Sequence, residues 1–294
     1  MDDRVEPGGG RREPGGAAVS ALDRWRDLLE SWRIPDAILA AAPESPWGFP
    51  PELFRGTGGS STVGHEPVPT VRRATEALPR RGSILDVGCG AGATSLPMAD
   101  RVGRLVGVDA QPDMLEAFVA AAAATGVAAQ AIPGTWPQVA AGAEAADLVV
   151  CGHVLYNVAD AGPFVLELTR HARQRVVLEI TGTHPLAWMS DLWLRFHSLE
   201  RPSGPTDDDA IAAIRETGAE PARDQVDAGA DRGGGFRRRA DAVALIRRRL
   251  CLPATMDGAI EAALGDRLRE HDGLWSTGPP RRRLVTLWWD VAEA

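Results

Sequence analysis

The chain has 294 residues, of which 44% are hydrophobic, enough for one large domain or two small ones. Its formal net charge of −8 argues against a nucleic acid as the main partner, because phosphate binding needs a basic face. All 32 basic residues are arginine, which excludes chemistry that depends on a lysine amine.

The three cysteines, Cys89, Cys151 and Cys251, lie far apart in the sequence and lack the C-x-x-C spacing of zinc sites. We therefore expect no metal, no disulfide framework and a reducing compartment. There is neither an apolar signal-peptide stretch near the N-terminus nor a run of about 18 apolar residues. These features predict a cytoplasmic protein without a membrane partner and leave its oligomeric state open.

The N-terminal part is predicted to be a disordered tail followed by a helical accessory segment. Residues 1–18 are rich in Gly, Pro, Arg and Glu and offer little to bury. Residues 19–69 form the accessory or cap segment. The elements expected within it are a Ser20 N-cap with an amphipathic helix over 21–32, a short helix over 34–42 and an irregular connection over 43–64.

From residue 70 onward, apolar strands alternate with helices. Helices are predicted over 70–78, 93–101, 112–126 and 163–172, and strands over 83–88, 104–110, 128–134, 146–152 and 175–181. This alternation indicates an α/β fold in which helices cover both faces of a parallel sheet.

The alternation breaks after residue 181. The expected elements are an aromatic-rich segment over 184–202, helices over 205–218, 241–252 and 257–271, a possible sixth strand over 221–228 and a last strand over 282–291. We expect one domain over 70–294, in which residues 183–275 include possible substrate-capping insertions.

A glycine-rich turn follows the first of these strands. Gly88, Gly90 and Gly92 allow the backbone to turn tightly and approach a ligand closely. Asp109 ends the next strand, where its carboxylate can accept hydrogen bonds from ribose hydroxyls. Asp86 would repel a pyrophosphate but would suit an ammonium group. The turn therefore favours a nucleoside cofactor with a cationic group over a dinucleotide.

The run ILDVGCGAG resembles the first motif of class I S-adenosylmethionine-dependent methyltransferases. VGVDAQPDML, ADLVVCGHVLYNV and RVVLEI resemble later motifs of this family, and LVTLWW is similar to its antiparallel seventh strand. The resemblance implies a Rossmann-like, doubly wound, mostly parallel sheet of seven strands with an antiparallel last strand, and S-adenosylmethionine as cofactor. The composition, typical of a GC-rich genome, suggests an actinobacterial-type small-molecule methyltransferase. The cofactor contacts implied are Asp86, Gly88, Cys89, Gly90, Gly92, Asp109, Ala110, Met114, Thr135, Trp136, Cys151 and Gly152.

Thr135 departs from the family pattern, because many relatives place an acidic residue beside the adenine amine at this point. The neighbouring Trp136 has two interpretations. It either stacks on the adenine or packs in the core, as tryptophans at strand ends more often do.

The methyl acceptor is expected beyond the carboxyl ends of the strands, where parallel sheets bind ligands. His153 is the candidate catalytic base, because imidazole often removes protons in enzymes. Packing beneath the cofactor or capping of the next helix is the alternative. The residues that this position nominates are His153, Tyr156, Asn157, Glu179 and His184.

Aromatic residues outside the cofactor motifs either cap an apolar acceptor or belong to the core. They are Trp25, Trp32, Trp47, Trp188, Trp193 and His197. The arginine triplets at 237–239, 247–249 and 281–283 are interpreted as solvated faces rather than as an RNA groove. The turn CGHV also lacks the N/D-P-P-Y/F pattern of enzymes that methylate nucleobase amines.

The sequence thus predicts an enzyme that methylates an oxygen, nitrogen or carbon atom of a small metabolite. Three alternatives remain open: a non-catalytic protein that binds S-adenosylmethionine, an RNA or protein methyltransferase, and, least favoured, an NAD(P)-dependent oxidoreductase.

Overall fold

The computed structural model describes residues 19–47, 62–63, 66–229 and 235–291. The predicted tail over 1–18 and most of the irregular connection over 43–64 lie outside the described residues. None of the described helices is both long and apolar enough to cross a membrane.

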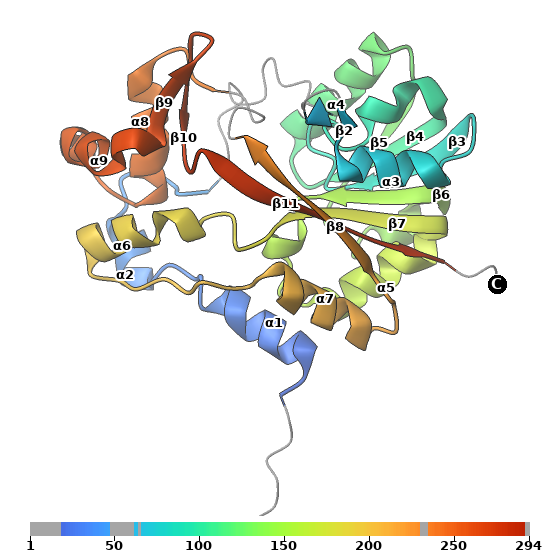
Figure 1. The fold of residues 1–294 in the computed structure, drawn as a ribbon, viewed down its shortest axis with the longest axis horizontal. Helices are drawn as coiled ribbons and strands as arrows, with labels where there is room; N and C mark the ends of the chain where they lie inside the picture. The colour runs from blue at the N-terminus through green and yellow to red at the C-terminus, as the bar shows by residue number, and fades with distance from the viewer. Residues whose placement is uncertain (1–18, 48–61, 64–65, 230–234, 292–294) are drawn as a thin grey trace, which may run out of the picture.

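A seven-stranded sheet forms the centre of the molecule, with the order β5-β4-β3-β6-β7-β11-β8 (Figure 1). Its strands are β3 (Gly82–Val87), β4 (Val102–Asp109), β5 (Ala129–Pro133), β6 (Ala146–Gly152), β7 (Ala172–Thr181), β8 (Ala222–Gly229) and β11 (Arg281–Asp290). β3 to β7 pair in parallel, and β11 is antiparallel to both β7 and β8. The predicted doubly wound, mostly parallel sheet of seven strands, including its sixth strand and antiparallel last strand, is confirmed.

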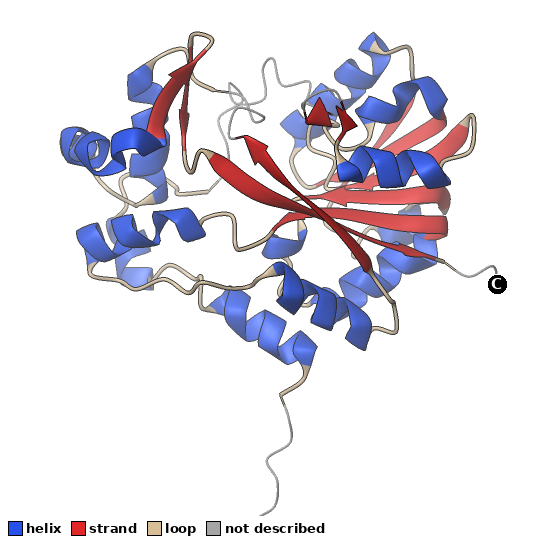
Figure 2. Ribbon diagram, viewed as in Figure 1, coloured by secondary structure: helices blue, strands red, loops and turns tan. Residues whose placement is uncertain are grey.

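Helices cover both faces of this sheet (Figure 2). Because side chains alternate along a strand, Ile84 and Leu85 of β3 enter different apolar clusters. Ile84 packs with Phe118 on one face, and Leu85 belongs to the cluster of Phe164 on the other. The covering helices are α3 (Pro69–Ala77), α4 (Pro112–Ala124), α5 (Ala161–His171) and α7 (Asp207–Glu216).

The N-terminal extension is helical, as expected. Ser20 caps α1 (Ala21–Glu30) by accepting a hydrogen bond from the Asp23 backbone at 3.0 Å. Trp25 of α1 is fully buried and donates its indole N–H to the Val158 carbonyl. The extension therefore packs on the main sheet domain through its first helix.

A second apolar core lies in a lobe beside the edge of the sheet where β11 begins (Figure 1). It is built from α2 (Asp36–Ala41), α6 (Ser190–His197), α8 (Arg239–Arg249), α9 (Asp257–Leu264) and the hairpin of β9 (Leu268–His271) and β10 (Leu274–Thr277). Since β11 runs antiparallel to the others, this edge is also where β6 and β7 end. The predicted insertion before the last strand thus lies on the ligand side of the sheet.

Two predicted helices are wrong in part. The helix expected over 93–101 is only a 3-10 helix at Leu96–Arg101, because Pro97 lacks a backbone N–H and cannot extend an α-helix there. The helix expected over 257–271 ends at Leu264, where Gly265 takes a positive φ of 51°. Residues beyond it form the β9–β10 hairpin instead.

Shorter elements complete the described chain. They are the strands β1 (Thr62–Val63) and β2 (Glu66–Pro67) and the 3-10 turns η3 (Ala140–Gly142), η4 (Leu155–Asn157), η5 (Ala187–Met189), η7 (Ala254–Met256) and η8 (Gly265–Arg267).

Candidate cofactor and acceptor site

The glycine turn after β3 is fastened to the end of β4. The backbone N–H groups of Gly88 and Cys89 donate to the Val108 carbonyl at 2.7 and 3.0 Å. Gly88, Gly90 and Gly92 have positive φ angles of 70°, 50° and 89°, which favour glycine. The turn is therefore held rigidly at the carboxyl edge of the sheet.

Only one of these glycines borders open space. A Cβ atom at Gly88 would lie 2.1 Å from Val154 Cγ2, and one at Gly92 would lie 2.6 Å from Leu96 Cδ1. At Gly90 no described atom lies within 4 Å of that position. Gly88 and Gly92 thus serve packing, whereas Gly90 leaves room for a ligand against the backbone.

Asp109 braces the turn from the end of β4. Its Oδ2 accepts from the Gly90 N–H and its Oδ1 from the Gln111 N–H, both at 2.9 Å. Each carboxylate oxygen keeps a second lone pair for a ribose hydroxyl. The neighbouring Ala110 is exposed, and Met114 on α4 is buried.

Asp86 is fully buried, and only one of its two carboxylate oxygens has a hydrogen-bond partner among the described residues. Its Oδ2 accepts from the Ser95 hydroxyl at 2.6 Å, but Oδ1 has no partner among the described residues. Burial raises the pKa of Asp86 from 3.8 to about 7; the Ser95 bond opposes this rise and the Asp109 charge adds to it. A buried acceptor oxygen without a donor fits the ammonium group of S-adenosylmethionine. The residues present therefore fit this cofactor.

Other predicted contacts form the walls of this region. Burial raises the pKa of the Cys89 and Cys151 thiols, so both act as small apolar groups. A Cβ at Gly152 would lie 2.3 Å from Thr94 Oγ1, so close packing explains that glycine.

The surroundings of Trp136, just after β5, agree with the interpretation that this side chain packs in the core. Its side chain is buried and meets the His171 ring edge-on, with centroids 4.8 Å apart and an interplanar angle of 77°. Thr135 is exposed and bonds Gln138.

His153 and Glu179 come together at the ends of β6 and β7. His153 Nε2 lies 3.1 Å from Glu179 Oε1, and the His153 backbone N–H donates to the Glu179 carbonyl at 2.8 Å. His153 adopts a positive φ of 58°, uncommon outside glycine, and its side chain is 49% exposed. Sequence position nominated both residues but did not pair them.

The second carboxylate oxygen of Glu179, Oε2, also has a hydrogen-bond partner. Thr70 donates to Glu179 Oε2 at 2.5 Å, and the Thr70 and Thr286 hydroxyls are 2.7 Å apart. Because the single Thr70 proton goes to Glu179, Thr286 is the donor in the second bond. Sequence reasoning missed both threonines; the only signal was their place on elements flanking the strand of Glu179.

Of the three remaining candidates for the acceptor site, Tyr156 and His184 are buried and Asn157 is exposed. Tyr156 is buried, and its hydroxyl pairs with Thr181 Oγ1 at 2.8 Å. His184 stacks on Trp32 with centroids 3.8 Å apart. Burial, aided by the Arg201 charge, lowers the pKa of His184 to about 3, so this ring is neutral. Asn157 is exposed at the end of η4.

Most of the aromatic cap candidates belong to the core. Trp25, Trp32 and Trp193 are buried, and His197 contacts the Leu250 carbonyl at 2.6 Å. Trp47, by contrast, is 56% exposed.

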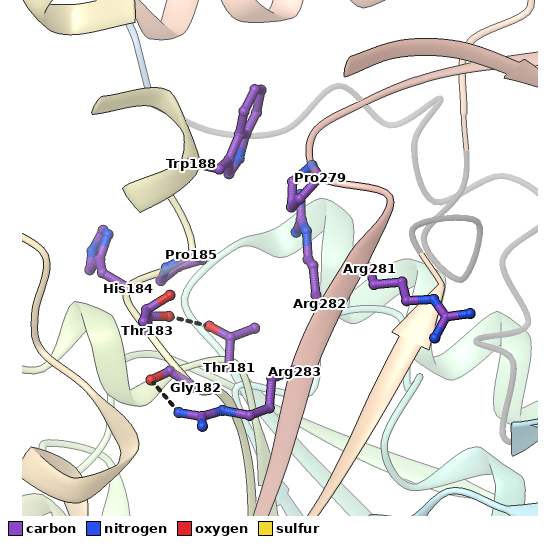
Figure 3. Close-up of a pocket in the computed structure, with 10 residues that line it drawn as sticks. All are labelled: Thr181, Gly182, Thr183, His184, Pro185, Trp188, Pro279, Arg281, Arg282 and Arg283. Carbon is purple, nitrogen blue, oxygen red and sulfur yellow. Dashed lines mark hydrogen bonds between the residues drawn. The ribbon is translucent and has the colours of Figure 1, made fainter. Parts of the chain in front are cut away.

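A hollow of about 180 Å³ opens beyond β7, where β11 begins (Figure 3). The sequence nominates Trp188 and His184 for this region, whereas it assigns the arginine triplet 281–283 to a solvated face. The lining residues are Thr181, Gly182, Thr183, His184, Pro185, Trp188, Pro279, Arg281, Arg282 and Arg283. In the described parts of the chain, no group of three or more His, Cys, Asp or Glu side chains is arranged to hold a metal.

Residues 84–175 match a family model described as a methyltransferase domain. Over 83 residues the chain is 37% identical to a ubiquinone biosynthesis O-methyltransferase of Methylobacterium sp. (strain 4-46). That match covers 28% of this chain and spans a third of the relative's length.

Solved structures with similar folds include the YcgJ protein of Bacillus subtilis, with 20% identity and a TM-score of 0.49. That alignment covers 76% of this chain and 98% of the other. Another is a SAM-dependent methyltransferase from Thiobacillus denitrificans in complex with S-adenosylhomocysteine, with 16% identity and a TM-score of 0.49. It covers 83% of this chain and all of the other.

Proposed function

We propose that this chain, whose residues 84–175 match the methyltransferase domain family, transfers a methyl group from S-adenosylmethionine to a hydroxyl of a small molecule. The observation that carries the choice of a hydroxyl is the contact between His153 and Glu179 at the carboxyl edge of the sheet. A hydroxyl must lose a proton on methylation, and this pair suits its removal.

The cofactor side of the reaction rests on the glycine turn. When bound, S-adenosylmethionine supplies an electrophilic methyl group on a sulfonium. Asp86 Oδ1 would pair with the ammonium group, Asp109 with the ribose hydroxyls, and Gly90 would give the ligand room. The implied contacts of Cys89, Cys151 and Gly152 would be packing contacts.

On the acceptor side, Glu179 sets the state of the imidazole. A carboxylate only accepts hydrogen, so its contact with Nε2 keeps the His153 proton there and leaves a lone pair on Nδ1. Nδ1 takes the hydroxyl proton as the oxygen forms its bond to the methyl carbon. The cofactor would supply the methyl carbon and would keep the electron pair of its carbon–sulfur bond on sulfur. Because His153 is half-exposed, it can release the proton to water.

Three finer assignments belong to this proposal. Residues 19–69 would act as an accessory segment to the domain over 70–294, with substrate-capping insertions within 183–275. The enzyme would be cytoplasmic, and nucleic acid would not be its acceptor, in agreement with the net charge of −8. The name of the curated relative, an O-methyltransferase, agrees with a hydroxyl acceptor.

The test measures S-adenosylhomocysteine binding by calorimetry and methyl transfer from radiolabelled S-adenosylmethionine to a panel of phenols, catechols and hydroxy acids. His153→Ala should lower kcat by about 10²–10⁴-fold while the cofactor Kd stays within about two-fold. Glu179→Gln should lower kcat by about ten-fold or more at unchanged KM, because it positions the base. Glu144→Gln, at an exposed carboxylate before the start of β6, is the control matched to Glu179→Gln and should leave turnover unchanged.

Full turnover by His153→Ala would remove this residue from the mechanism. Tight binding of S-adenosylhomocysteine without transfer to any acceptor would favour the non-catalytic alternative. Absence of cofactor binding would reject methyl transfer itself, and binding of a nicotinamide dinucleotide instead would favour the oxidoreductase.

A further inference from the structure

Arg282 occupies an unusual position in the hollow beyond β7. It is half-buried, and no carboxylate among the described residues pairs with it. A Cβ atom at Gly278 would lie 2.8 Å from Arg282 Nη2 and 3.7 Å from Trp188 Cε2. The guanidinium and the indole therefore adjoin the same small space (Figure 3).

Two other arginines near this space, Arg283 and Arg267, are already paired with carboxylates. Arg283 bonds Asp207 at 2.7 Å, and Arg267 bonds both oxygens of Asp191 at 2.8 and 2.9 Å. Asp207 is in turn shared with Arg223 at 2.7 Å, so each of its two oxygens already binds an arginine other than Arg282.

Arg269 adds positive charge to the same region. It donates to the backbone carbonyls of Asp266 and Gly278 at 3.1 and 3.0 Å, and the structure gives it no carboxylate among the described residues. Burial, followed by the charge of Arg269, lowers the pKa of Arg282. A half-buried cation next to a second cation is stabilised by an anion brought by a ligand.

The hollow also lies within reach of the His153–Glu179 pair. Thr181, which lines it, follows Glu179 by two residues, and the pairing of β11 with β7 places Arg282 two residues further along, so the backbones of Glu179 and Arg282 are about 13 Å apart along the sheet. An aromatic hydroxy acid that carries its carboxylate on a short chain beyond the ring spans most of this length. An aromatic hydroxy acid could therefore place its hydroxyl at the base and its carboxylate at Arg282.

We propose that Arg282 binds a carboxylate of the methyl acceptor and that Trp188 contacts the flat part of the same molecule. The acceptor class is an aromatic hydroxy acid. This inference rests on the proposed methyl transfer, whose cofactor step is measured separately below. A planar guanidinium binds a carboxylate through two parallel hydrogen bonds, which gives orientation as well as affinity.

The experiment is calorimetric binding in the presence of saturating S-adenosylhomocysteine. The probes are 4-hydroxybenzoate, 3,4-dihydroxybenzoate and 4-hydroxyphenylacetate, each compared with its amide, together with 4-hydroxyphenyl phosphate. At least one acid should bind the unmodified protein about ten-fold or more tightly than its amide. Arg282→Gln should abolish that preference and leave amide binding unchanged, and Arg282→Lys should retain part of it.

Arg80→Gln is the matched control, because Arg80 is exposed before β3 at the opposite edge of the sheet. It removes the same charge and should not alter the preference for the acid. The thermal midpoint of ligand-free Arg282→Gln should equal or exceed that of the unmodified protein, since a cation without a carboxylate partner is removed.

The proposal is overturned if no acid binds more tightly than its amide, or if Arg282→Gln keeps the preference. It is also overturned if the phosphate ester binds about ten-fold more tightly than every carboxylate, which would assign the pocket to phosphates. Normal S-adenosylhomocysteine binding with any of these outcomes rejects the Arg282 proposal alone. Loss of S-adenosylhomocysteine binding in the unmodified protein rejects the methyl-transfer proposal.

Discussion

A fully buried carboxyl group such as that of Asp86 is ionised only at a cost in free energy. Its pKa of about 7 in the folded protein lies above the ordinary value of 3.8. Between these values the folded protein binds more protons than the unfolded chain, so stability falls as pH rises from about 4 to 7. The loss amounts to roughly 4 kcal/mol at most. A cationic ligand beside Oδ1 would offset it.

The variant Asp86→Asn tests whether the ionised carboxyl of Asp86 pairs with the ammonium group of the ligand. Between pH 5 and 7 the affinity of the unmodified protein for S-adenosylhomocysteine should rise by up to about ten-fold per pH unit, because pairing with the ammonium requires the ionised carboxyl. The variant should bind more weakly near pH 7 and show no such rise. Calorimetry in two buffers of different ionisation enthalpy counts the released proton; equal pH profiles for both proteins would contradict the assignment.

The individual residues of the cofactor turn were predictable from sequence because they are close together in the chain. Gly90 and Asp109 show their role through spacing alone. Arg282 could not be found in this way, because its environment depends on Trp188 and Gly278, which reach it only through the fold. The arginine triplet around it gave the opposite impression of a solvated face.

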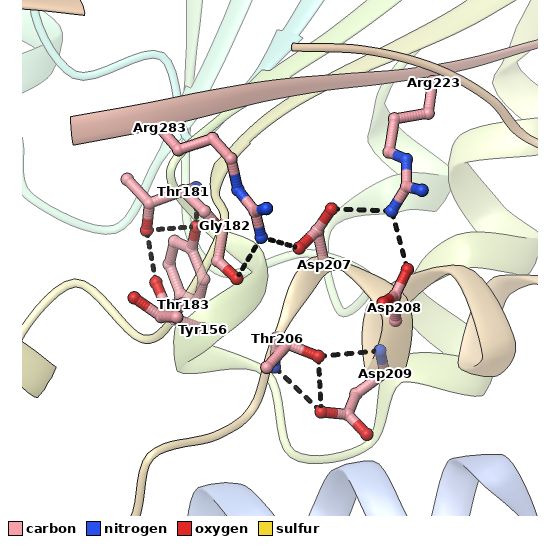
Figure 4. A network of polar contacts seen from close by, with 10 residues as sticks. All are labelled: Tyr156, Thr181, Gly182, Thr183, Thr206, Asp207, Asp208, Asp209, Arg223 and Arg283. Atoms are coloured by element: carbon pink, nitrogen blue, oxygen red, sulfur yellow. Dashed lines mark hydrogen bonds and ion pairs between the residues drawn. The ribbon is translucent and has the colours of Figure 1, made fainter. Parts of the chain in front are cut away.

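At the scale of elements, the N-terminus of α7 binds two residues that line the hollow, Gly182 and Arg283 (Figure 4). Thr206 and Asp209 form a reciprocal capping box at its start. Asp207 has 2% of its side chain exposed and joins Arg223 of β8 to Arg283 of β11, each at 2.7 Å. The helix thereby ties two neighbouring strands to the segment that follows β7.

Asp207→Asn should lower the free energy of unfolding by about 1–3 kcal/mol, because a buried acceptor loses its charge-assisted hydrogen bonds to two arginines. Asp208→Asn is the matched control, since Asp208 also contacts Arg223 but is 80% exposed. It should change stability by less than about 1 kcal/mol. Urea unfolding measures both, and similar losses in the two variants would show that burial of Asp207 does not matter.

The boundaries of elements were predicted less well than their existence. The β9–β10 hairpin had a usable signal in the pair Asp272-Gly273, whose φ angles of 50° and 75° form a two-residue turn. The helical spacing of apolar residues before this turn led instead to the prediction of a single helix over 257–271. Similarly, Pro97 was a visible reason to shorten the predicted helix over 93–101.

At the scale of the whole molecule, Asp86 and His184 oppose each other in their response to pH. The pKa of His184 falls to about 3 in the folded protein, mainly through burial, from the ordinary 6.5. The unfolded chain therefore binds more protons between these values, and stability falls as pH decreases from about 6.5 to 3. Asp86 has the reverse effect from about 4 to 7, so the two contributions largely cancel where they overlap.

Replacing either titratable residue should reveal the pH dependence that the other one gives to the stability of the protein. Relative to the unmodified protein, Asp86→Asn should lose up to about 1.4 kcal/mol per pH unit on acidification between pH 6.5 and 4.5. His184→Phe, which keeps an aromatic ring against Trp32, should instead lose stability as pH rises. The double variant should restore the original pH dependence. Urea unfolding across this range gives the comparison, and parallel profiles for all four proteins would contradict it.

The strand order could be expected as a whole because alternating apolar strands and helices leave few parallel arrangements. The second lobe could not, since its core joins Ile34 near the N-terminus to Trp193 and Ile260. Such contacts have no local pattern. The positions of the candidate cofactor turn and of His153 and Glu179 could therefore be proposed from sequence, whereas the contact between these two residues and the surroundings of Arg282 could not.

Tyr156 is the single tyrosine of the chain, and its phenol is held at Thr181 where the hollow begins. Burial raises the pKa of this phenol above its ordinary value, so the phenolate forms at a higher pH than that of an exposed tyrosine. Phenolate absorbs at longer wavelength than the nine tryptophans of the chain. In alkaline solution the absorbance of Tyr156 therefore reports how well this one phenol is shielded from water, at the point where the hollow begins.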